Sequence, residues 1–334
     1  MAVRKVTIKD VAREAGVSIS TVSNALNNVN VLHPETKRHV LEVAERMHYI
    51  PNLNGKNLKS QATNVIGLFI TSMRGPYYGG LSDSIYRCCK KNGYELEIFV
   101  GENPEFMVAN ILGHRVDGAI ILNENIGMDK VRLFEEKEIP VVFIDREYRN
   151  EHMSSIIFDS YHEGELAAKY LMELGNRSFL YIQGVLHTFD NIERRRGFTN
   201  MLKKHGVILR EEDMLKGNFE QDTAYNAMKE YLKSGRDLPD AIFAGNDSSA
   251  LGTIEALTDF GVKVPEQVSV IGCDDIEVAA LVSPSITTIR TSFERQGSLA
   301  VEQVLKLMAG DPGSIEVLYG KIIPRESTCS RILI

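Results

Sequence analysis

The spacing of hydrophobic residues in the first fifty positions predicts three short helices. Apolar residues recur at helical intervals over about 8–15, over about 19–26, and in a third stretch that begins at Pro34 and continues to about residue 47. Gly16 supplies a turn between the first two helices, and Ser18 is placed to cap the second. This arrangement predicts a helix-turn-helix, although periodicity alone fits a helical hairpin without a nucleic-acid role equally well.

From about residue 65 the pattern changes to short apolar runs that alternate with amphipathic stretches. The predicted strands are 65–70, 95–100, 118–122, 141–144, 179–183, 241–244 and 268–271, and the predicted helices lie near 78–92, 161–174, 190–205, 222–234 and 247–260. Alternating strands and helices predict parallel sheets covered on both faces. Some 270 residues exceed what one such sheet needs. The sequence therefore predicts a small all-α head followed by a two-lobed α/β body.

Composition is that of a globular protein, with 43% hydrophobic and 25% charged residues. No apolar run approaches the roughly eighteen residues that span a bilayer. The opening residues MAVRKVTIKD lack the apolar core of a secretory signal. We therefore expect a cytoplasmic protein with no membrane partner, in which the sequon at Asn176 is a chance match.

Charge is distributed unevenly along the chain. The first sixty residues carry nine Lys and Arg against five Asp and Glu, a net of +4, whereas the whole chain has a net charge of -7 and the remainder is therefore -11. Phosphate contacts dominate affinity for nucleic acids, so a basic head on an acidic body favours a polyanion at the head alone.

Candidate catalytic and metal-binding patterns are weak. Cys88, Cys89, Cys273 and Cys329 show no paired metal-ligand spacing, which predicts reduced, structural thiols. The adjacent acids Asp274 and Asp275 have no His/Cys cluster beside them, and the chain has no Gly-rich nucleotide loop or nucleophile elbow. We expect no metal, no cofactor and no enzymatic activity.

Four segments of the head resemble one known family. They are Thr7-Ile8-Lys9-Asp10-Val11-Ala12, Ala15-Gly16-Val17-Ser18, Thr21-Val22-Ser23 and Tyr49-Ile50-Pro51-Asn52. In order and spacing they are similar to the DNA-binding head of the lactose and galactose repressor family. The resemblance implies a helix-turn-helix domain over residues 1–52.

The same resemblance implies a set of DNA contacts. It places on the DNA-binding surface Thr7, Ser18, Ile19, Ser20, Thr21, Ser23, Asn24 and, by a looser match, Asn30. Asn24 can pair with adenine, Ser20 can donate or accept, and Ile19 offers apolar contact to a thymine methyl. Thr21 and Ser23 suit phosphates, which fix register without carrying sequence.

Residues 53–64 occupy the position of the family's hinge helix and linker. Leu58 matches the family's apolar wedge, which enters the minor groove of bent DNA; the alternative is a leucine packed on the body. Gly55 and Lys56 stand where alanine and arginine are common in the family. Glycine costs a helix about 1 kcal/mol relative to alanine, and Lys56 would make a less directional contact to DNA than arginine.

The body, residues 65–334, resembles the family's two-lobed domain, which is like a periplasmic sugar-binding protein with three crossovers between its lobes. The resemblance is carried by Val65-Ile66-Gly67-Leu68, Gly75-Pro76-Tyr77-Tyr78, Val116-Asp117-Gly118, Gly197-Phe198, Gly245-Asn246-Asp247 and Val270-Ile271-Gly272-Cys273-Asp274-Asp275. One departure is the short span 102–115, where the family usually has a longer helix.

Candidate effector-binding residues follow from strand ends and from the resemblance. Ligands of open α/β sheets lie beyond the carboxyl ends of the strands, where Asp145, Asn246 and Asp274 are expected. The resemblance adds an arginine and aromatic residues: Arg194, Phe219, Tyr77 and Phe158. Phe158 has a core role as its alternative. Carboxylates and amides accept hydrogen bonds from sugar hydroxyls, and an arginine fork holds a hydroxyl pair or a carboxylate.

Together these features predict a transcriptional regulator. The resemblance implies a homodimer that binds palindromic double-stranded operator DNA, and no apolar heptad tail is present to build a tetramer. The effector is expected to be a small molecule, a sugar, bound between the lobes, and the controlled genes those of carbohydrate use. The alternatives are a sugar-binding receptor with no DNA role and a regulator that needs a co-repressor.

Overall fold

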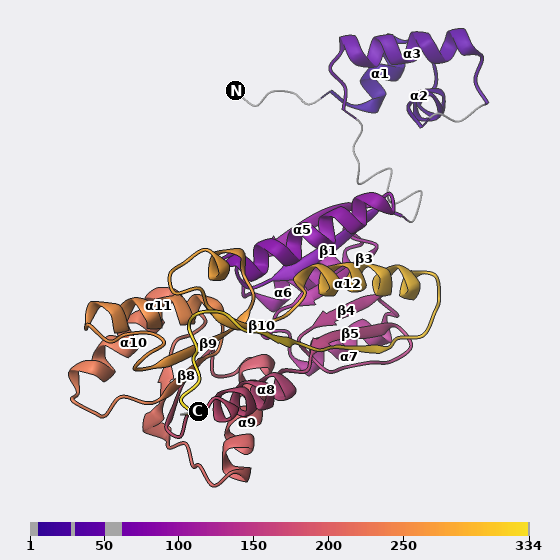
Figure 1. Cartoon of the computed structure of the whole chain (residues 1–334). Helices are drawn as coiled ribbons and strands as arrows, with labels where there is room; N and C mark the ends of the chain where they lie inside the picture. Colours follow the sequence, from indigo (N-terminus) through magenta and orange to yellow (C-terminus); the bar gives the residue numbers. More distant parts are fainter. Residues whose placement is uncertain (1–5, 28–30, 51–61, 333–334) are drawn as a thin grey trace. The chain divides into compact units, whose positions relative to one another are not determined.

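The computed structural model describes residues 6–27, 31–50 and 62–332 (Figure 1). The chain divides into two compact units, Met1–Thr63 and Asn64–Ile334. Most of the expected hinge, together with Asn30, Lys56 and Leu58, lies outside the described residues.

Three helices form the smaller unit: α1 (Ile8–Glu14), α2 (Ile19–Leu26) and α3 (Pro34–Arg46). Val11, Val22 and Val40, one from each helix, are fully buried at its centre. The Ser18 hydroxyl caps α2 by accepting the Thr21 N–H at 3.1 Å. The helix-turn-helix predicted from the apolar spacing is therefore present, with its third helix beginning at Pro34 as predicted.

The first lobe of the larger unit contains a six-stranded parallel sheet in the order β11-β5-β4-β3-β1-β2. Its strands are β1 (Val65–Ile70), β2 (Glu95–Val100), β3 (Gly118–Leu122), β4 (Val141–Ile144), β5 (Met153–Phe158) and β11 (Ile315–Leu318). Helices α5 (Pro76–Lys91) and α12 (Phe293–Met308) bury apolar residues on one face of the sheet. Helices α6 (Pro104–Leu112) and α7 (Met128–Glu136) cover the other.

The second lobe repeats this plan with the order β12-β10-β9-β8-β6-β7. Its strands are β6 (Phe179–Gln183), β7 (Met214–Lys216), β8 (Ala241–Ala244), β9 (Ser269–Asp274), β10 (Thr287–Arg290) and β12 (Lys321–Ile323), of which β12 is antiparallel to β10. Helices α8 (Ser160–Glu173) and α9 (Phe189–Lys204) cover one face, and α10 (Gln221–Lys233) and α11 (Asp247–Asp259) cover the other (Figure 1). Two short 3-10 helices span Glu211–Asp213 and Glu277–Ala280.

Three chain segments connect the lobes. The chain passes from β5 to α8, from β10 to α12, and from β11 to β12. The first and third crossings are neighbours, because Phe158 at the end of β5 pairs with Leu318 at the end of β11, and Asp159 donates its N–H to the Leu318 carbonyl at 2.9 Å. The second and third are neighbours as well, because Arg290 at the end of β10 pairs with Lys321 at the start of β12. The expected α/β body with two lobes and three crossovers is observed.

One local prediction needs correction. The strand predicted over 268–271 is Ser269–Asp274, so Asp274 ends the strand instead of following it. In the short span 102–115 the helix is α6, nine residues long.

All four cysteines are free thiols, with Cys89 and Cys273 buried. Among the described helices, none is long and apolar enough to cross a membrane.

Candidate effector cleft and DNA-binding surface

A cavity of about 740 Å³ lies between the two lobes, at the carboxyl ends of their strands. Its lining includes all seven residues proposed from the sequence: Tyr77, Asp145, Phe158, Arg194, Phe219, Asn246 and Asp274. Both sheets present their strand ends to it, which is where ligands bind in open α/β folds. A volume of this size accommodates a small ligand.

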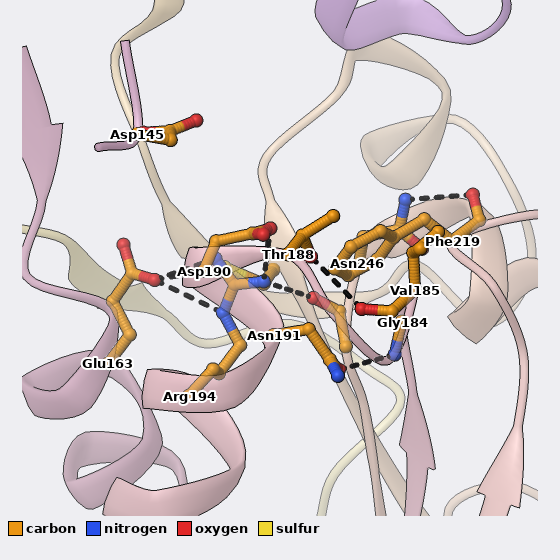
Figure 2. Close-up of polar contacts among 12 residues, drawn as sticks. Asp145, Glu163, Gly184, Val185, Thr188, Asp190, Asn191, Arg194, Phe219 and Asn246 are labelled. Carbon is orange, nitrogen blue, oxygen red and sulfur yellow. Dashed lines mark hydrogen bonds and ion pairs between the residues drawn. The ribbon is translucent and has the colours of Figure 1, made fainter. Parts of the chain in front are cut away.

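Arg194 lies in the wall of the cavity contributed by the second lobe and is only 4% exposed (Figure 2). Its Nε and Nη2 donate to one oxygen of the buried Glu163 at 3.1 and 2.8 Å, and its Nη1 donates to the Gly245 carbonyl at 3.0 Å. Asp190 lies one helical turn earlier on α9, with its carboxylate 3.6 Å from the same Nη1. The guanidinium is therefore held from several sides before any ligand arrives.

The first turn of α9 is fastened to the end of β6, and this fixes Asp190 and Arg194. Figure 2 shows the Gly184 N–H donating to the Asn191 side-chain oxygen, at 2.6 Å, and the Thr188 hydroxyl donating to the Val185 carbonyl, at 3.0 Å. Both contacts join the loop after the strand to the helix that follows it.

Phe219 and Asn246 form the adjoining part of the wall. Asn246 caps α11 by accepting the Ser249 N–H at 2.9 Å, and its Nδ2 donates to the Phe219 carbonyl at 3.1 Å. Phe219 has a left-handed backbone, with φ of 61°, and its ring lies over Gly184, where an added Cβ would come within 2.0 Å of the ring. Asn246 thus acts partly as a support that holds Phe219 at the cavity.

In the first lobe, Asp145 is bound by two side chains. Tyr77 Oη is 3.0 Å from one carboxylate oxygen, to which it donates, and Gln296 Nε2 donates to the other at 3.1 Å. Gln296 comes from α12, 151 residues further along the chain. Burial, followed by the nearby charge of Asp190, raises the pKa of Asp145 to about 7. Phe158 is almost fully buried at the end of β5 and also lines the cavity. It therefore occupies both of the positions considered for it, the core and the cavity wall.

Asp274 ends β9 with φ of 118° and lines the cavity. Its main-chain oxygen accepts from the Thr291 hydroxyl at 3.5 Å, but no residue in the described part of the chain donates a hydrogen bond to its carboxylate. Burial and the neighbouring Asp247 raise the pKa of the Asp274 carboxyl well above its usual range. The group therefore gains from any donor that a ligand brings.

Sequence reasoning missed Glu163, Asp190 and Gln296. Asp190 carried a usable signal, because it lies four residues before Arg194 on a predicted helix and such residues are neighbours on its surface. Glu163 and Gln296 carried none, since each meets its partner through a contact between distant parts of the chain.

On the helical unit, α2 presents the residues expected to contact DNA. Ile19 is 46% exposed, and Ser20 is exposed beside it. Thr21, Ser23 and Asn24 are partly exposed. The Ser18 hydroxyl contacts those of Ser20 and Thr21 at 2.7 and 2.8 Å.

Thr7 lies at the start of α1, where its N–H and hydroxyl both donate to the Asp10 carboxylate, at 3.0 and 2.7 Å. The bond from the Thr7 N–H to the Asp10 carboxylate is one half of a capping box at the start of α1. In α2, the exposed side chains of the first turn form a small polar surface that includes one apolar residue, Ile19. Such a surface is suited to contacts with base edges and phosphates.

Comparison with known proteins identifies this architecture. Residues 7–52 match the family model of bacterial regulatory proteins, lacI family, and residues 168–328 match that of a periplasmic binding protein-like domain. The HTH-type transcriptional repressor PurR of Yersinia enterocolitica is 34% identical over 330 residues, with 96% of both chains covered. The chain belongs to the lacI family. This lacI-family protein is a DNA-binding transcriptional repressor regulated by a ligand.

Further relatives of the lacI-family repressor agree with this placement. PurR of Photorhabdus laumondii is 33% identical, again with 96% of both chains covered. The lac repressor dimer bound to operator and the anti-inducer ONPF has a TM-score of 0.79 at 25% identity, covering 98% of this chain and 100% of that one. The complex of the transcriptional regulator CelR with cellobiose has a TM-score of 0.72 at 26% identity, covering 97% and 100%.

Proposed function

We propose that this repressor controls genes of carbohydrate use and releases its operator when a small sugar binds between the two lobes. The observation that carries the proposal is the cavity of about 740 Å³, into which carboxylates of both lobes project beside aromatic side chains. Sugar hydroxyls both donate and accept, so Asp145 and Asp274 are suitable partners for them. Phe219 provides a flat apolar wall for a sugar ring. The complex of the similar CelR with cellobiose supports this ligand class.

The second candidate function is repression that needs a co-repressor. The co-repressor would be a neutral planar heterocycle, such as a nucleobase, whose binding increases the affinity for operator DNA. One observation favours it, the abundance of aromatic rings around the cavity: Tyr77, Tyr78, Phe143, Phe158, Phe189, Phe219 and Phe293. Aromatic rings stack on planar ligands with a gain of about 0.5 to 1.5 kcal/mol per pair. The two candidates differ in ligand shape and in the sign of the response.

For DNA, we propose a homodimer that binds a palindromic operator. The proposed parts are a head over 1–52, a hinge and linker over 53–64, and an effector-binding and dimerisation body over 65–334. Two copies of α2 would enter successive major grooves, because dimers of this motif contact half-sites about one helical turn, or a multiple of it, apart. Leu58 would enter the minor groove between them. The protein would act in the cytoplasm, where its operator lies.

Coupling between the sites requires a difference in ligand affinity between the DNA-bound and free states. The ligand contacts both lobes, so it would favour one relative position of the lobes over the other. A change in the relative position of the lobes would move the hinge segments of the two subunits. It would thereby change the distance between the two heads. A receptor with no DNA role would have the same cleft and none of this coupling.

Operator binding, measured by fluorescence anisotropy with and without sugars and nucleobases, tests the proposal. Affinity should fall steeply with salt, as phosphate contacts require, and a sugar should lower it further. Arg194→Ala leaves Glu163 as a buried carboxylate without its cation, so the response to the sugar should weaken tenfold or more while operator affinity without ligand changes little.

Asn24→Ala is the matched control on the DNA side, since it should lose sequence preference and keep the ligand-induced thermal shift. Two outcomes would count against the proposal. A nucleobase that tightens operator binding would establish the co-repressor candidate instead. An affinity for duplex DNA that does not depend on salt or sequence would remove the DNA-binding role.

A further inference from the structure

Every arginine that lines the effector cavity already has a partner within the protein. Arg74 forms an ion pair with Glu220 at 3.2 Å, across the two lobes. Arg146 donates to the Ile126 carbonyl at 2.6 Å and lies over the ring of Phe143. The third, Arg194, has the three acceptors described above. A ligand that enters this cleft therefore meets arginines that already contact acceptors or an aromatic ring of the protein.

Acidic side chains in the lining outnumber the arginines. The acids are Glu102, Glu124, Asp145, Glu147, Asp190, Glu220 and Asp274, against three arginines. Around Arg194 the balance is negative even before these are considered, because Glu163 and Asp190 are both within 4 Å of the single guanidinium. Asp274 adds a carboxylate to which no described residue donates a hydrogen bond.

Helix amino termini would normally oppose this conclusion, because their free N–H groups bind anions. Three helices of the second lobe, α8, α9 and α11, begin at the cavity wall, and α5 and α12 begin there in the first lobe. Asp190 places a negative charge in the first turn of α9, and Asn246 accepts the Ser249 N–H at the start of α11. Side chains also cap α8 and α12, through Asp159 and Ser292. The start of α5 has neither a side-chain cap nor an acid, and its first residue, Pro76, has no N–H to offer an anion.

We propose that the cleft accepts only ligands without negative charge and rejects their phosphorylated forms, and that Glu163 and Asp190 are the residues that keep phosphate from Arg194. This rests on the proposed function in taking the cleft as the effector site. A free arginine fork holds phosphate by two parallel hydrogen bonds. Here both edges of the fork face protein acceptors, so an anion would have to displace a buried carboxylate and approach others of its own sign. An unphosphorylated sugar, which brings donors, meets acceptors instead.

The raised pKa values of two lining carboxyls agree with this geometry. Burial is the main cause for both Asp145 and Asp274, and neighbouring carboxylates add to it. The same shifts favour the protonated, uncharged forms of these two carboxyls. The exclusion of phosphate from Arg194 therefore rests on Glu163 and Asp190, which contact the guanidinium directly.

Inorganic phosphate is the direct probe, used with the full-length protein in a thermal-shift titration against sodium chloride of equal ionic strength. The parent should show no stabilisation by phosphate beyond the chloride control at roughly 10 mM. Glu163→Gln and Asp190→Asn, which keep shape and remove charge, should each acquire saturable stabilisation by phosphate. Adding Arg194→Ala to either variant should abolish it, which places the bound phosphate at the arginine.

Two results would overturn the inference. One is stabilisation of the parent by phosphate that disappears in Arg194→Ala, and the other is a folded Asp190→Asn protein that acquires no phosphate binding. Because the Asp190 side chain is 25% exposed, this variant stays informative even if Glu163→Gln fails to fold.

A second titration pairs sugars with their phosphate esters, glucose with glucose 6-phosphate and ribose with ribose 5-phosphate, and follows operator affinity. An ester that acts as strongly as its parent sugar also contradicts the inference. If no compound changes operator affinity, the proposed function fails, while the phosphate titration still decides the charge preference of the cleft independently.

Discussion

Replacing Gly197 by alanine should destabilise the second lobe, although alanine is the better helix former. Gly197 lies in α9 where this helix crosses α8, and an added Cβ would be 1.9 Å from the main-chain oxygen of Tyr161. Ordinary contact begins near 3.4 Å, so the two backbones would have to separate by about 1.5 Å. The obstacle is backbone, which cannot rotate away as a side chain can.

The magnitude follows from two opposing effects. Glycine to alanine in a helix interior gains about 1 kcal/mol, and overpacking a close contact costs about 1 to 3 kcal/mol or more. A separation of the helices also lengthens the ion pair between Glu163 on α8 and Arg194 on α9, whose partners lie within a turn of the crossing. Breaking a buried pair costs about 3 kcal/mol or more. We expect a net loss of about 2 kcal/mol or more.

Thermal unfolding followed by circular dichroism measures this loss, which for a unit of this size corresponds to a decrease in Tm of about 4 °C or more. Gly79→Ala is the matched control, since Gly79 is also inside a helix but an added Cβ meets no atom within 4 Å. That variant should gain up to about 1 kcal/mol. If Gly197→Ala is as stable as Gly79→Ala, the two helices do not approach as closely as described, and the reasoning fails.

Three further predictions concern the cleft, the head and the hinge. Burial raises the pKa of Asp145 to about 7, so the folded protein binds the proton of this carboxyl more tightly than the unfolded chain does. The free energy of unfolding is therefore unaffected below about pH 4 and decreases as the pH rises through 7. Asp145→Asn should therefore unfold at a higher temperature than the parent at pH 8 and at the same temperature at pH 4, and a pH-independent difference would contradict the assignment. Ser18→Ala removes the cap of α2 and should cost the head about 1 kcal/mol, seen as faster amide hydrogen exchange in α2 with α5 unchanged as the internal reference. Leu58→Ala should weaken operator binding by a few kcal/mol and leave ligand-induced thermal shifts intact, and equal operator affinity would exclude the wedge role.

Strands with an uninterrupted apolar run could be predicted from the sequence, whereas one strand and one helix whose pattern buried polar residues interrupt were missed. Strands β1, β2, β3, β4, β6 and β8 were predicted with the bounds observed. Strand β5 was missed because Ser154 and Ser155 are buried within it and interrupt the apolar run. Helix α12 was missed for a similar reason, since Gln296 and Gln303 lie on its buried face.

The short strands β11 and β12 carry even less signal, because together they supply seven residues and none of the seven is buried. Strand β7 has only three residues, and two of the three buried residues of β10 are the polar Thr287 and Thr288.

In the candidate site, the positions of residues could be predicted from the sequence but their hydrogen bonds could not. Positions at strand ends, such as Asp145 and Asn246, could be located because topology determines where they lie. Their bonding could not, because the contact of Asp145 with Gln296 depends on how α12 returns to the first lobe. Whether these residues bind an effector stays a prediction, and so do the DNA contacts.

The three neighbouring crossings limit how the lobes can move. A single connection would let one lobe rotate about any axis relative to the other. Three segments placed side by side instead favour rotation about the one axis that runs through them. Phe158 pairs with Leu318 where two of the segments leave the first lobe, and Arg290 pairs with Lys321 where two of them meet the second lobe. Rotation about this axis bends all three segments equally, while twisting across it would stretch some and compress others. Opening and closing of the cleft thus reduces to one angular coordinate, along which residues far from the axis travel furthest.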